Sequence, residues 1–362
     1  MDSAEREGLR PKGNVPNLRF PEFQEEWEEY RIEDITENIS SGRCKSHSSS
    51  GKYNLYGSTG IIGKTNEACY EGNLVLVARV GVNAGSLQIL NEPCGITDNT
   101  LIIKPKEVDV QYIYYFLQHF NLNRLIFGSG QPLITGGMLK KVKVSLGTIQ
   151  EQNKITRLLS ILDERIASQN KIIEDLKKLK SAISENLFKA VKGDVVILYE
   201  ICEIIKGKQI NGEILSEKGK YYVMNGGTEP SGYYSDYNVE ANTISISEGG
   251  NSCGYVQFNS SPFWSGGHCY TIQKIADNVD NLYLYHYLKS HEDVIMKLRI
   301  GSGLPNIQKK DLAMFKIKLP TVEQQKSIST FLSSLERKAE IEEMLLNAMK
   351  KEKQYLLRQM FI

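Results

Sequence analysis

The chain carries two copies of one sequence pattern, and this duplication constrains its fold more than any single motif. The matched segments are residues 128–134 (GSGQPLI) with 301–307 (GSGLPNI), residues 146–155 with 319–328, and, further upstream, residues 73–85 with 242–254. The first two pairs share an offset of 173 residues and the third has an offset of 169. Self-similarity of this kind predicts two domains of the same architecture, one after the other along the chain.

The body of each copy is β-rich. Residues 74–77 form a continuous apolar run that is typical of a buried strand, whereas Ile and Ser alternate over residues 244–247 as in a half-exposed strand. Residues 112–117 and 282–288 are aromatic and apolar without a period of two, so a strand and a helix packed on the sheet both remain open. The predicted fold class is α+β, with two β-rich domains that are each followed by a long helix.

Each of these helices has a start signal and a seam of apolar residues. Thr148 and Thr321 are predicted N-caps, with Glu151 and Gln324 three residues later as in a capping box. The expected seam positions are Ile155, Leu159, Leu162, Ile166, Gln169, Ile173, Leu176, Lys180, Ile183 and Leu187, and then Ile328, Leu332, Leu335, Ala339, Glu342, Leu346, Met349, Lys353, Leu356 and Met360. Matching seams favour an antiparallel coiled coil between the two helices. The alternative is that each helix packs only on its own β domain.

Composition excludes a strong general attraction to nucleic acid. The chain has 44 Lys and Arg against 43 Asp and Glu, so any DNA contact must come from local patches. Its six cysteines contain no Cys-x-x-Cys pair, which favours reduced thiols. No apolar run reaches the roughly 18 residues of a membrane helix, and the first residues lack an apolar signal region. We therefore expect a cytoplasmic protein with no membrane partner.

Several catalytic motifs are missing or displaced. Residues 57–65 resemble a P-loop but carry one residue too many, and no amphipathic helix follows them. No two prolines are adjacent, so the Pro-Pro motif of DNA amino-methyltransferases is absent. Glu336 and Lys338 have the spacing of some nuclease sites but fall within a predicted helix, where a solvated face is the simpler interpretation. We expect no catalytic residues, no cofactor and no enzyme activity in this chain.

One group of residues could form a zinc site or a thiol nucleophile with its base, namely Cys253, His268 and Cys269. The corresponding residues of the first copy are Ala84, Asn99 and Thr100, so this chemistry is not common to both copies. Buried thiols and a hydrogen-bonded histidine are the favoured interpretation, with no metal.

The motifs together resemble the specificity subunit of type I restriction-modification systems. The resemblance rests on residues 16–23 (PNLRFPEF) with Trp27, on the two Gly-Ser-Gly segments, and on the two Leu-x-Thr-(Ile/Val)-x-x-Gln helix openings. It covers nearly the whole chain. It implies two target recognition domains at opposite ends of paired helical spacers, a bipartite double-stranded DNA target, and chemistry supplied by methyltransferase and restriction subunits. Recognition domains of this family diverge strongly, so no base contact is carried over.

The expected boundaries follow from the repeat and the helix signals. They are an N-terminal lead-in over 1–29, a first recognition domain over 30–147, a central helical spacer over 148–190, a second recognition domain over 191–319, and a C-terminal helical spacer over 320–362. A second hypothesis keeps this fold for a non-catalytic repeat scaffold that binds proteins, which would show no salt-dependent binding to duplex DNA. A third, a fragment of an enzyme that cuts and methylates, is disfavoured by the missing motifs.

Polar loops between strands are the expected reading surface, since base edges need donors and acceptors while phosphates need cations and amides. The candidates in the first copy are Arg43, Lys45, Lys52, Ser58, Thr59, Arg79, Asn83 and Gln131, and those in the second are Lys208, Gln209, Lys220, Asn225, Thr228, Glu248, Asn251 and Asn306. Arg79 aligns with Glu248, which exchanges a guanine-type donor for a cytosine-type acceptor. For any one residue, an ordinary solvated turn is an equally good interpretation.

Overall fold

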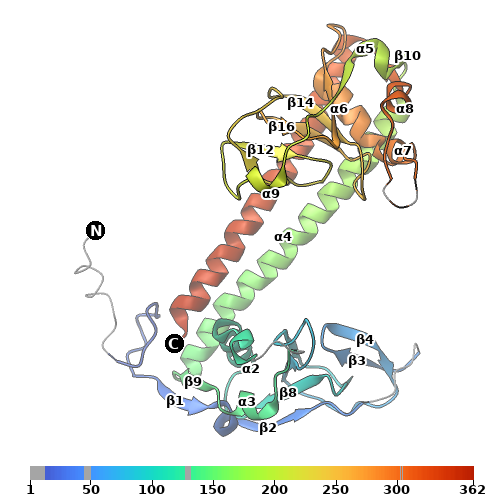
Figure 1. The fold of residues 1–362 in the computed structure, drawn as a ribbon. Coiled ribbons are helices and arrows are strands. Elements are labelled where there is room, and N and C mark those ends of the chain that lie inside the picture. Colours follow the sequence, from blue (N-terminus) through green and yellow to red (C-terminus); the bar gives the residue numbers. More distant parts are fainter. Residues whose placement is uncertain (1–12, 45–49, 127–131, 302, 304) are drawn as a thin grey trace, which may run out of the picture. The chain divides into compact units, whose positions relative to one another are not determined.

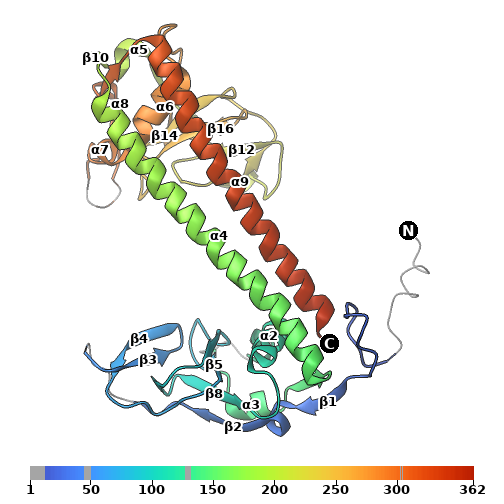
Figure 2. The same ribbon diagram turned by 180° about the vertical axis from the view of Figure 1, so that it is seen from behind.

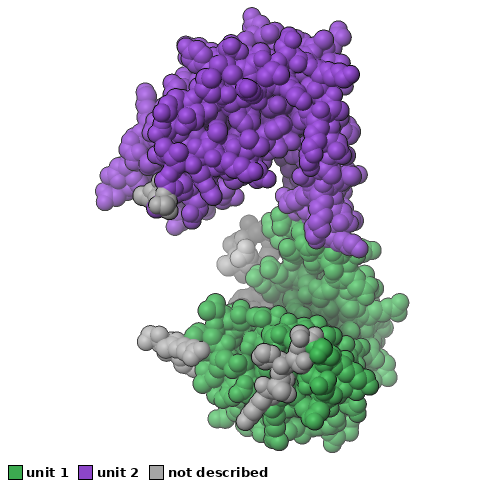
Figure 3. Space-filling model, turned by 90° about the vertical axis from the view of Figure 1, so that its right-hand side faces the viewer, with its two compact units in different colours: residues 1–170, 345–362 green, residues 171–344 purple. Residues whose placement is uncertain are grey.

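The computed structural model describes residues 13–44, 50–126, 132–301, 303 and 305–362. These residues form two compact units, one made of residues 1–170 with 345–362 and the other of residues 171–344 (Figure 3). Each β-rich body lies within one unit, and each unit also contains part of both long helices.

The β-sheets of the two units have the same strand order. Unit 1 contains a four-stranded antiparallel sheet in the order β2 (Thr36–Ser41), β8 (Thr100–Pro105), β5 (Leu74–Ala78), β6 (Leu87–Leu90), and a three-stranded sheet in the order β4 (Gly60–Thr65), β3 (Tyr53–Gly57), β7 (Cys94–Ile96). Unit 2 repeats them as β11 (Glu203–Lys206), β17 (Cys269–Gln273), β14 (Thr243–Ser247), β15 (Val256–Asn259), and as β13 (Tyr233–Tyr234), β12 (Tyr221–Met224), β16 (Trp264–Ser265). In both small sheets the central strand pairs in parallel with the last strand of that order. The predicted duplication of the fold is confirmed.

A two-stranded ribbon in each unit joins the start of the body to its end. Strand β1 (Glu28–Arg31) pairs antiparallel with β9 (Lys143–Leu146), and β10 (Asp194–Ile197) pairs in the same way with β18 (Lys316–Leu319). A short helical turn follows the first strand of each ribbon, namely η1 (Ile32–Ile35) or α5 (Leu198–Ile201). The smaller helices η2 (Leu122–Leu125), α3 (Gly136–Lys140), η3 (Gly212–Ile214), α7 (Glu292–Met296) and α8 (Lys309–Ala313) lie in the connections.

The two aromatic segments that the pattern left open are helices. They are α2 (Val110–Phe120) and α6 (Asn281–Ser290), and they pack on the large sheet of their unit. Each begins with an aspartate whose carboxylate caps the first turn, because Asp109 accepts from Tyr112 N and Asp280 accepts from Tyr283 N. The buried residues are 112, 113 and 115–117 in α2 and 283–288 in α6, and because they do not alternate with exposed ones, no strand-like pattern is visible.

The predicted half exposure of residues 244–247 is wrong. All of β14 is buried, including Ser245 and Ser247. The face that carries these serines is covered by polar neighbours: Ser245 Oγ accepts from Asn259 Nδ2 at 2.9 Å, and Ser247 Oγ donates to the carbonyl of Gly226 at 2.6 Å. Alternation therefore separates an apolar face from a hydrogen-bonded one, since a second layer of chain lies where we expected solvent.

The long helices are α4 (Ile149–Ala190) and α9 (Val322–Met360), drawn in green and red in Figure 1. Thr148 and Thr321 are N-caps as predicted, since their hydroxyls accept from Glu151 N and Gln324 N at 3.3 and 3.4 Å. The reciprocal half of the capping box is wrong for Glu151. Its carboxylate instead accepts two bonds from Arg19 at 2.7 and 2.8 Å and one from Trp27 Nε1 at 2.9 Å.

Within each unit the two helices pair antiparallel (Figures 1 and 2). In unit 2, Lys177 forms an ion pair with Glu343 and Lys180 forms one with Glu336. In unit 1, Lys353 contacts both oxygens of Asp163, at 2.6 and 2.8 Å. All twenty predicted seam positions are buried or half-buried, which confirms the heptad.

The two polar seam lysines have equivalent surroundings. Tyr115 donates to Asp163 at 2.9 Å and Tyr285 donates to Glu336 at 3.1 Å, so each carboxylate joins a seam lysine to a tyrosine of the neighbouring body. The helices therefore pack both on each other and on the β-rich bodies. Glu336, which we expected on a solvated helix face, lies inside this contact and is only 26% exposed.

A buried histidine makes unit 2 sensitive to acid. His286 on α6 is 3% exposed, and its Nε2 lies 2.9 Å from Ser333 Oγ on α9. Burial lowers its pKa to about 4, although the nearby Glu336 acts in the opposite direction. Because the folded pKa lies below the ordinary value, the contribution of the neutral histidine to the free energy of unfolding is complete above about pH 6.5. It is lost progressively as the pH falls from there to about 4, by at most roughly 3 kcal/mol.

We expect His286→Gln, which keeps a partner for Ser333 but does not titrate, to lose less stability between about pH 7 and pH 4.5 than the parent protein. Urea denaturation followed by the fluorescence of Trp264, in a Trp27→Phe background, measures unit 2. Identical pH profiles for the two proteins would show that His286 does not carry this acid sensitivity.

Candidate nucleic-acid interface

The loop that connects β5 to β6 in unit 1 is built in the same way as the loop that connects β14 to β15 in unit 2. It contains Gly81 or Gly250, each with a positive φ, 79° and 75°. The amide of Gly81 donates to the carbonyl of Pro132, and that of Gly250 to the carbonyl of Pro305, both at 3.0 Å. Pro132 and Pro305 are aligned positions of the two copies, so both units hold this loop with the same backbone bond.

The residues that open these loops are fixed by equivalent backbone bonds. Arg79 N donates to Asn99 O, and Glu248 N donates to His268 O, each at 2.9 Å. Arg79 O and Glu248 O both accept a backbone bond at 2.8 Å, from residues 134 and 307. The alignment of Arg79 with Glu248 is therefore confirmed in three dimensions.

A second shared feature places a cation close to these loops. Gly42 N donates to Thr100 O at 3.0 Å and Gly207 N donates to Cys269 O at 2.8 Å. A Cβ at either glycine would lie 2.2–2.3 Å from a backbone oxygen of the neighbouring loop, so only glycine fits. The next residues are Arg43 and Lys208, both exposed. The two units thus present a basic side chain at the same backbone position.

In unit 1 three of the candidates gather around Asn99 and Thr100. Ser58 Oγ donates to the carbonyl of Asn99 at 3.1 Å, the same oxygen that accepts from the amide of Arg79, and Arg43 follows the glycine bonded to Thr100. Arg79 Nε is buried and has no hydrogen-bond partner among the described residues. The described residues therefore leave part of the donor capacity of this half-buried guanidinium unused.

In unit 2 the corresponding position is acidic and partly paired. Glu248 Oε1 accepts from Lys206 Nζ at 2.6 Å and from Tyr270 OH at 3.1 Å. Its other oxygen, Oε2, lies 3.8 Å from His268 Nδ1 and accepts no hydrogen bond within the described ranges. The Glu248 side chain is 10% exposed and its Oε2 is buried, so one oxygen is satisfied internally while the accepting capacity of the other is unused.

Two further candidates lie against the turn that leads into His268. Asn225 Oδ1 accepts from the amide of His268 at 3.1 Å. A Cβ at Gly267 would lie 2.3 Å from Gln209 Oε1, so that side chain rests on the turn. Gln209, Asn225 and Glu248 are therefore brought together in one place.

The remaining candidates do not form one cluster, although Asn83 and Asn251 lie in the two aligned loops and Asn306 pairs with Gly249. Lys52 and Lys220 lie over the rings of their neighbours Tyr53 and Tyr221, at 5.2 and 5.0 Å from the centroids. The other positions that the structure describes are exposed, and they are Thr59, Asn83, Thr228, Asn251 and Asn306. Lys45 and Gln131 lie outside the described residues.

Sequence reasoning missed two residues of this surface. Asn99 and His268 occupy equivalent exposed positions next to Arg79 and Glu248. The sequence alignment of the two copies already paired Asn99 with His268, but it was used only to judge a possible zinc site. The same pairing could have marked them as two different polar side chains at equivalent positions. His268 is 61% exposed, and its backbone amide rather than its ring makes the hydrogen bond.

The thiols next to this surface are buried. Burial raises the pKa of Cys269 to about 11 and also raises the pKa of Cys253. Within the described ranges, no group of three or more His, Cys, Asp or Glu side chains is arranged to hold a metal ion. These cysteines lie where we expected buried thiols.

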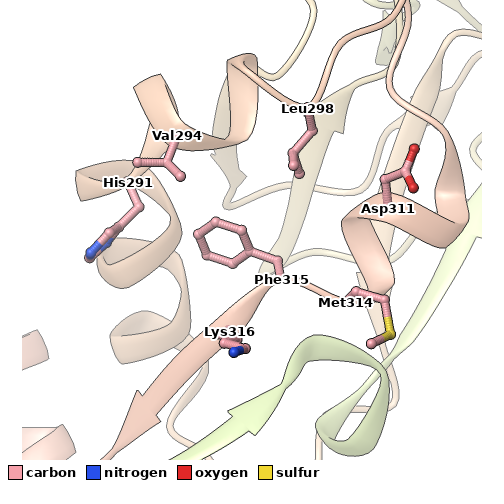
Figure 4. Close-up of a pocket in the computed structure, with 7 residues that line it drawn as sticks. All are labelled: His291, Val294, Leu298, Asp311, Met314, Phe315 and Lys316. Carbon is pink, nitrogen blue, oxygen red and sulfur yellow. The ribbon is translucent and has the colours of Figure 1, made fainter.

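A separate hollow of about 520 Å³ lies in unit 2 between α7, α8 and the start of β18 (Figure 4). Phe315 projects into its centre, with Val294 and Leu298 beside it and Lys316 below the ring. Most of the seven lining residues are apolar. Such a lining has few groups that could read base edges, so we do not assign the hollow to the candidate interface.

Comparison with known proteins connects both halves of the chain to one family. The sequence model described as type I restriction modification DNA specificity domain matches residues 24–178 and again residues 191–351. The MjaVIII specificity subunit of Methanocaldococcus jannaschii is 26% identical over 381 residues, which covers 90% of this chain and 88% of that protein. A Mycoplasma genitalium protein whose assigned name is that of a type I specificity subunit is 26% identical over 260 residues, 66% of this chain and 68% of its own length.

Solved structures share the fold. The S subunit of a type I restriction-modification system from M. genitalium superposes with a TM-score of 0.71 at 20% identity, covering 96% of this chain and 99% of that one. A chain from a study of complex assembly and conformational transition of the type I system gives a TM-score of 0.57 at 16% identity, with coverages of 94% and 98%. No helix among the described residues is long and apolar enough to cross a membrane.

Proposed function

This chain belongs to the type I restriction-modification DNA specificity family, and we propose that residues 30–147 and 191–319 are its two target recognition domains. Each domain would read one half of a bipartite sequence in double-stranded DNA. The helical spacers would occupy residues 148–190 and 320–362, with residues 1–29 as a lead-in.

One observation carries the proposal of two different half-sites. The same loop frame occurs in both units, but Arg79 and Asn99 in one are replaced by Glu248 and His268 in the other. A guanidinium recognises the acceptors of guanine, whereas a carboxylate accepts from the amino group of cytosine. Two recognition domains that read different half-sites require this combination of equal backbone positions with different donors and acceptors.

Affinity would come from cations near the same edge. Arg43 and Lys208 follow the two close-packed glycines, and both are exposed. Cations of this kind position DNA through its phosphates and carry no sequence information by themselves. This division of roles fits a chain whose overall charge is close to neutral.

The chemistry would be supplied by partners. We propose that this chain is not itself an enzyme, and that methyltransferase and restriction subunits assemble with it. The long helices offer docking surfaces, because Ile172 and Leu179 on α4 and Ile341 and Met344 on α9 are 45–63% exposed. Exposed apolar side chains on otherwise polar helices favour a protein partner.

Mapping of methylated bases tests this function. The full chain is co-expressed with a type I methyltransferase subunit, and plasmid DNA from the cells is read by single-molecule sequencing. We expect methylation within a split motif that has a constant gap. A complex that forms but methylates no defined motif would contradict DNA recognition by this chain.

A single substitution tests the first recognition domain. We expect Arg79→Ala to weaken discrimination at one half-site by roughly 1–3 kcal/mol and to leave the other half-site unchanged. Lys104→Ala is the matched control, because Lys104 is a cation of the same domain that forms an exposed ion pair with Glu37. Methylation frequencies on a library of single-base target variants measure both proteins. Equal loss at both half-sites would show that Arg79 acts on general affinity or stability instead.

A further inference from the structure

Unit 1 contains two thiols in direct contact. Cys44 Sγ lies 2.9 Å from Cys69 Sγ, within hydrogen-bonding distance and roughly 0.9 Å longer than a disulfide bond. Cys44 is buried and Cys69 is exposed, so a reagent in solvent reaches Cys69 first. The aligned position of Cys44 in unit 2 is Gln209, and the contact is therefore particular to the first domain.

Both cysteines are held by the same short strand, β7. Cys44 N donates to the carbonyl of Ile96 at 2.9 Å, at one end of β7. At the other end, Tyr70, the residue after Cys69, exchanges two backbone bonds with Cys94, at 3.1 and 2.9 Å. The two sulfurs are therefore placed by the sheet and not by a chance encounter of loops.

We propose that Cys44 and Cys69 form a redox-active dithiol that a peroxide converts into an intramolecular disulfide. The Cys69 thiolate attacks one oxygen of hydrogen peroxide, giving a sulfenic acid and releasing hydroxide. The sulfur of Cys44 then displaces the hydroxyl from Cys69 as water and loses its own proton. In sum two thiols are oxidised, one peroxide is reduced, and two waters are formed.

The surroundings give the reaction a defined pH dependence. The contact with Cys44 and partial burial raise the pKa of Cys69 to about 11. Since the thiolate is the attacking species, the rate should rise about tenfold per pH unit from neutral pH towards 10. Burial likewise raises the pKa of Cys94 and Cys202, and neither has the exposure of Cys69.

Thiol counting on the folded full-length chain tests the proposal. The protein is treated with hydrogen peroxide at about pH 8.5, quenched, unfolded and titrated for free thiols, and its peptides are mapped without reduction. We expect the loss of two of the six thiols and one bridged peptide pair, Cys44 with Cys69. The variant Cys69→Ser should lose none. The matched control Cys202→Ser, a buried cysteine of unit 2, should still lose two.

Other outcomes would overturn the proposal. These are six thiols remaining, a bridge from Cys69 to Cys94, or Cys69 recovered as sulfinic acid while Cys44 stays free. Dithiothreitol should return the oxidised protein to six thiols, and failure to do so would also contradict a disulfide. The variant Cys44→Ser separates the steps, because it should stop at oxidised Cys69 without a bridge.

Discussion

Replacing residues 30–147 with the corresponding domain of another family member should change one half of the methylated target and leave the other half intact. The expected effect is large, because one mismatched base pair already costs about 1–3 kcal/mol and a whole half-site contains several. Methylation mapping of the exchanged protein, co-expressed with the methyltransferase subunit, measures both halves at once. The reciprocal exchange of residues 191–319 should change only the second half.

The structure explains why this exchange should fold. The first junction lies in β1 and the second directly follows β9, and these strands pair with Tyr30 opposite Val144, so the exchanged segment enters and leaves at neighbouring points. Three contacts to the rest of unit 1 must be kept in the donor. They are the ring of Tyr112 beside Trp27, the hydroxyl of Tyr115 on Asp163, and the ring of Phe116 beside Phe361.

Donors that carry tyrosine at the positions of Tyr112 and Tyr115 and phenylalanine at that of Phe116 are therefore the appropriate choice. A donor that lacks Tyr115 serves as the control for misfolding, since Asp163 would then lose a hydrogen bond and the whole protein should lose stability. An unchanged target after exchange with a matched donor would contradict the assignment of residues 30–147 as a target recognition domain.

The helices and the duplication could be predicted because their signals are local and periodic. A seam of spacing three and four requires no knowledge of distant residues, and it identified Lys180 and Lys353 as polar interruptions of both helices. Their carboxylate partners, Glu336 and Asp163, follow only from the antiparallel register that the structure adds. The pattern gave the face of each helix but not its ion pairs.

Tertiary contacts explain why the exposure of β14 was predicted wrongly. Ser245 and Ser247 have the alternation of a solvated strand, yet Asn259 and the carbonyl of Gly226 bond to them in the interior. These partners lie 14 and 21 residues away along the chain. A local pattern therefore separates the two faces of the strand without showing what covers each face.

The candidate surface could be predicted only in part, for the same reason. Lys52 and Lys220 were chosen for their charge, and they lie over neighbouring tyrosine rings. Asn99 and His268 were missed, because only their backbone bonds to the two aligned loops mark them as part of the surface. Polarity along the chain identifies loops, whereas the shared backbone frame identifies which loop residues meet.

The N-terminal segment is fastened to α4 by a buried charge, and breaking this contact should strongly destabilise unit 1. The Glu151 side chain is 1% exposed and that of Arg19 is 13% exposed. Asn14 and Trp27 exchange hydrogen bonds at 2.6 and 2.9 Å, and Leu18 N donates to the carbonyl of residue 359 on α9. Arg19→Met would leave the Glu151 carboxylate without its cation, at a cost of about 3 kcal/mol.

Two further variants distinguish a buried ion pair from a surface one. Arg19→Met with Glu151→Gln should recover at least half of the loss, because the amide stays an acceptor for Trp27 and no buried charge is left unpaired. Gln324, the equivalent of Glu151 in the second copy, is exposed, so Gln324→Met should change stability by less than about 0.5 kcal/mol. Urea denaturation in a Trp264→Phe background follows unit 1 through Trp27 alone, since the chain has two tryptophans. If Arg19→Met were as mild as Gln324→Met, the contact would be a surface ion pair in solution, and the N-terminal segment would owe its place to Trp27 and its backbone bonds.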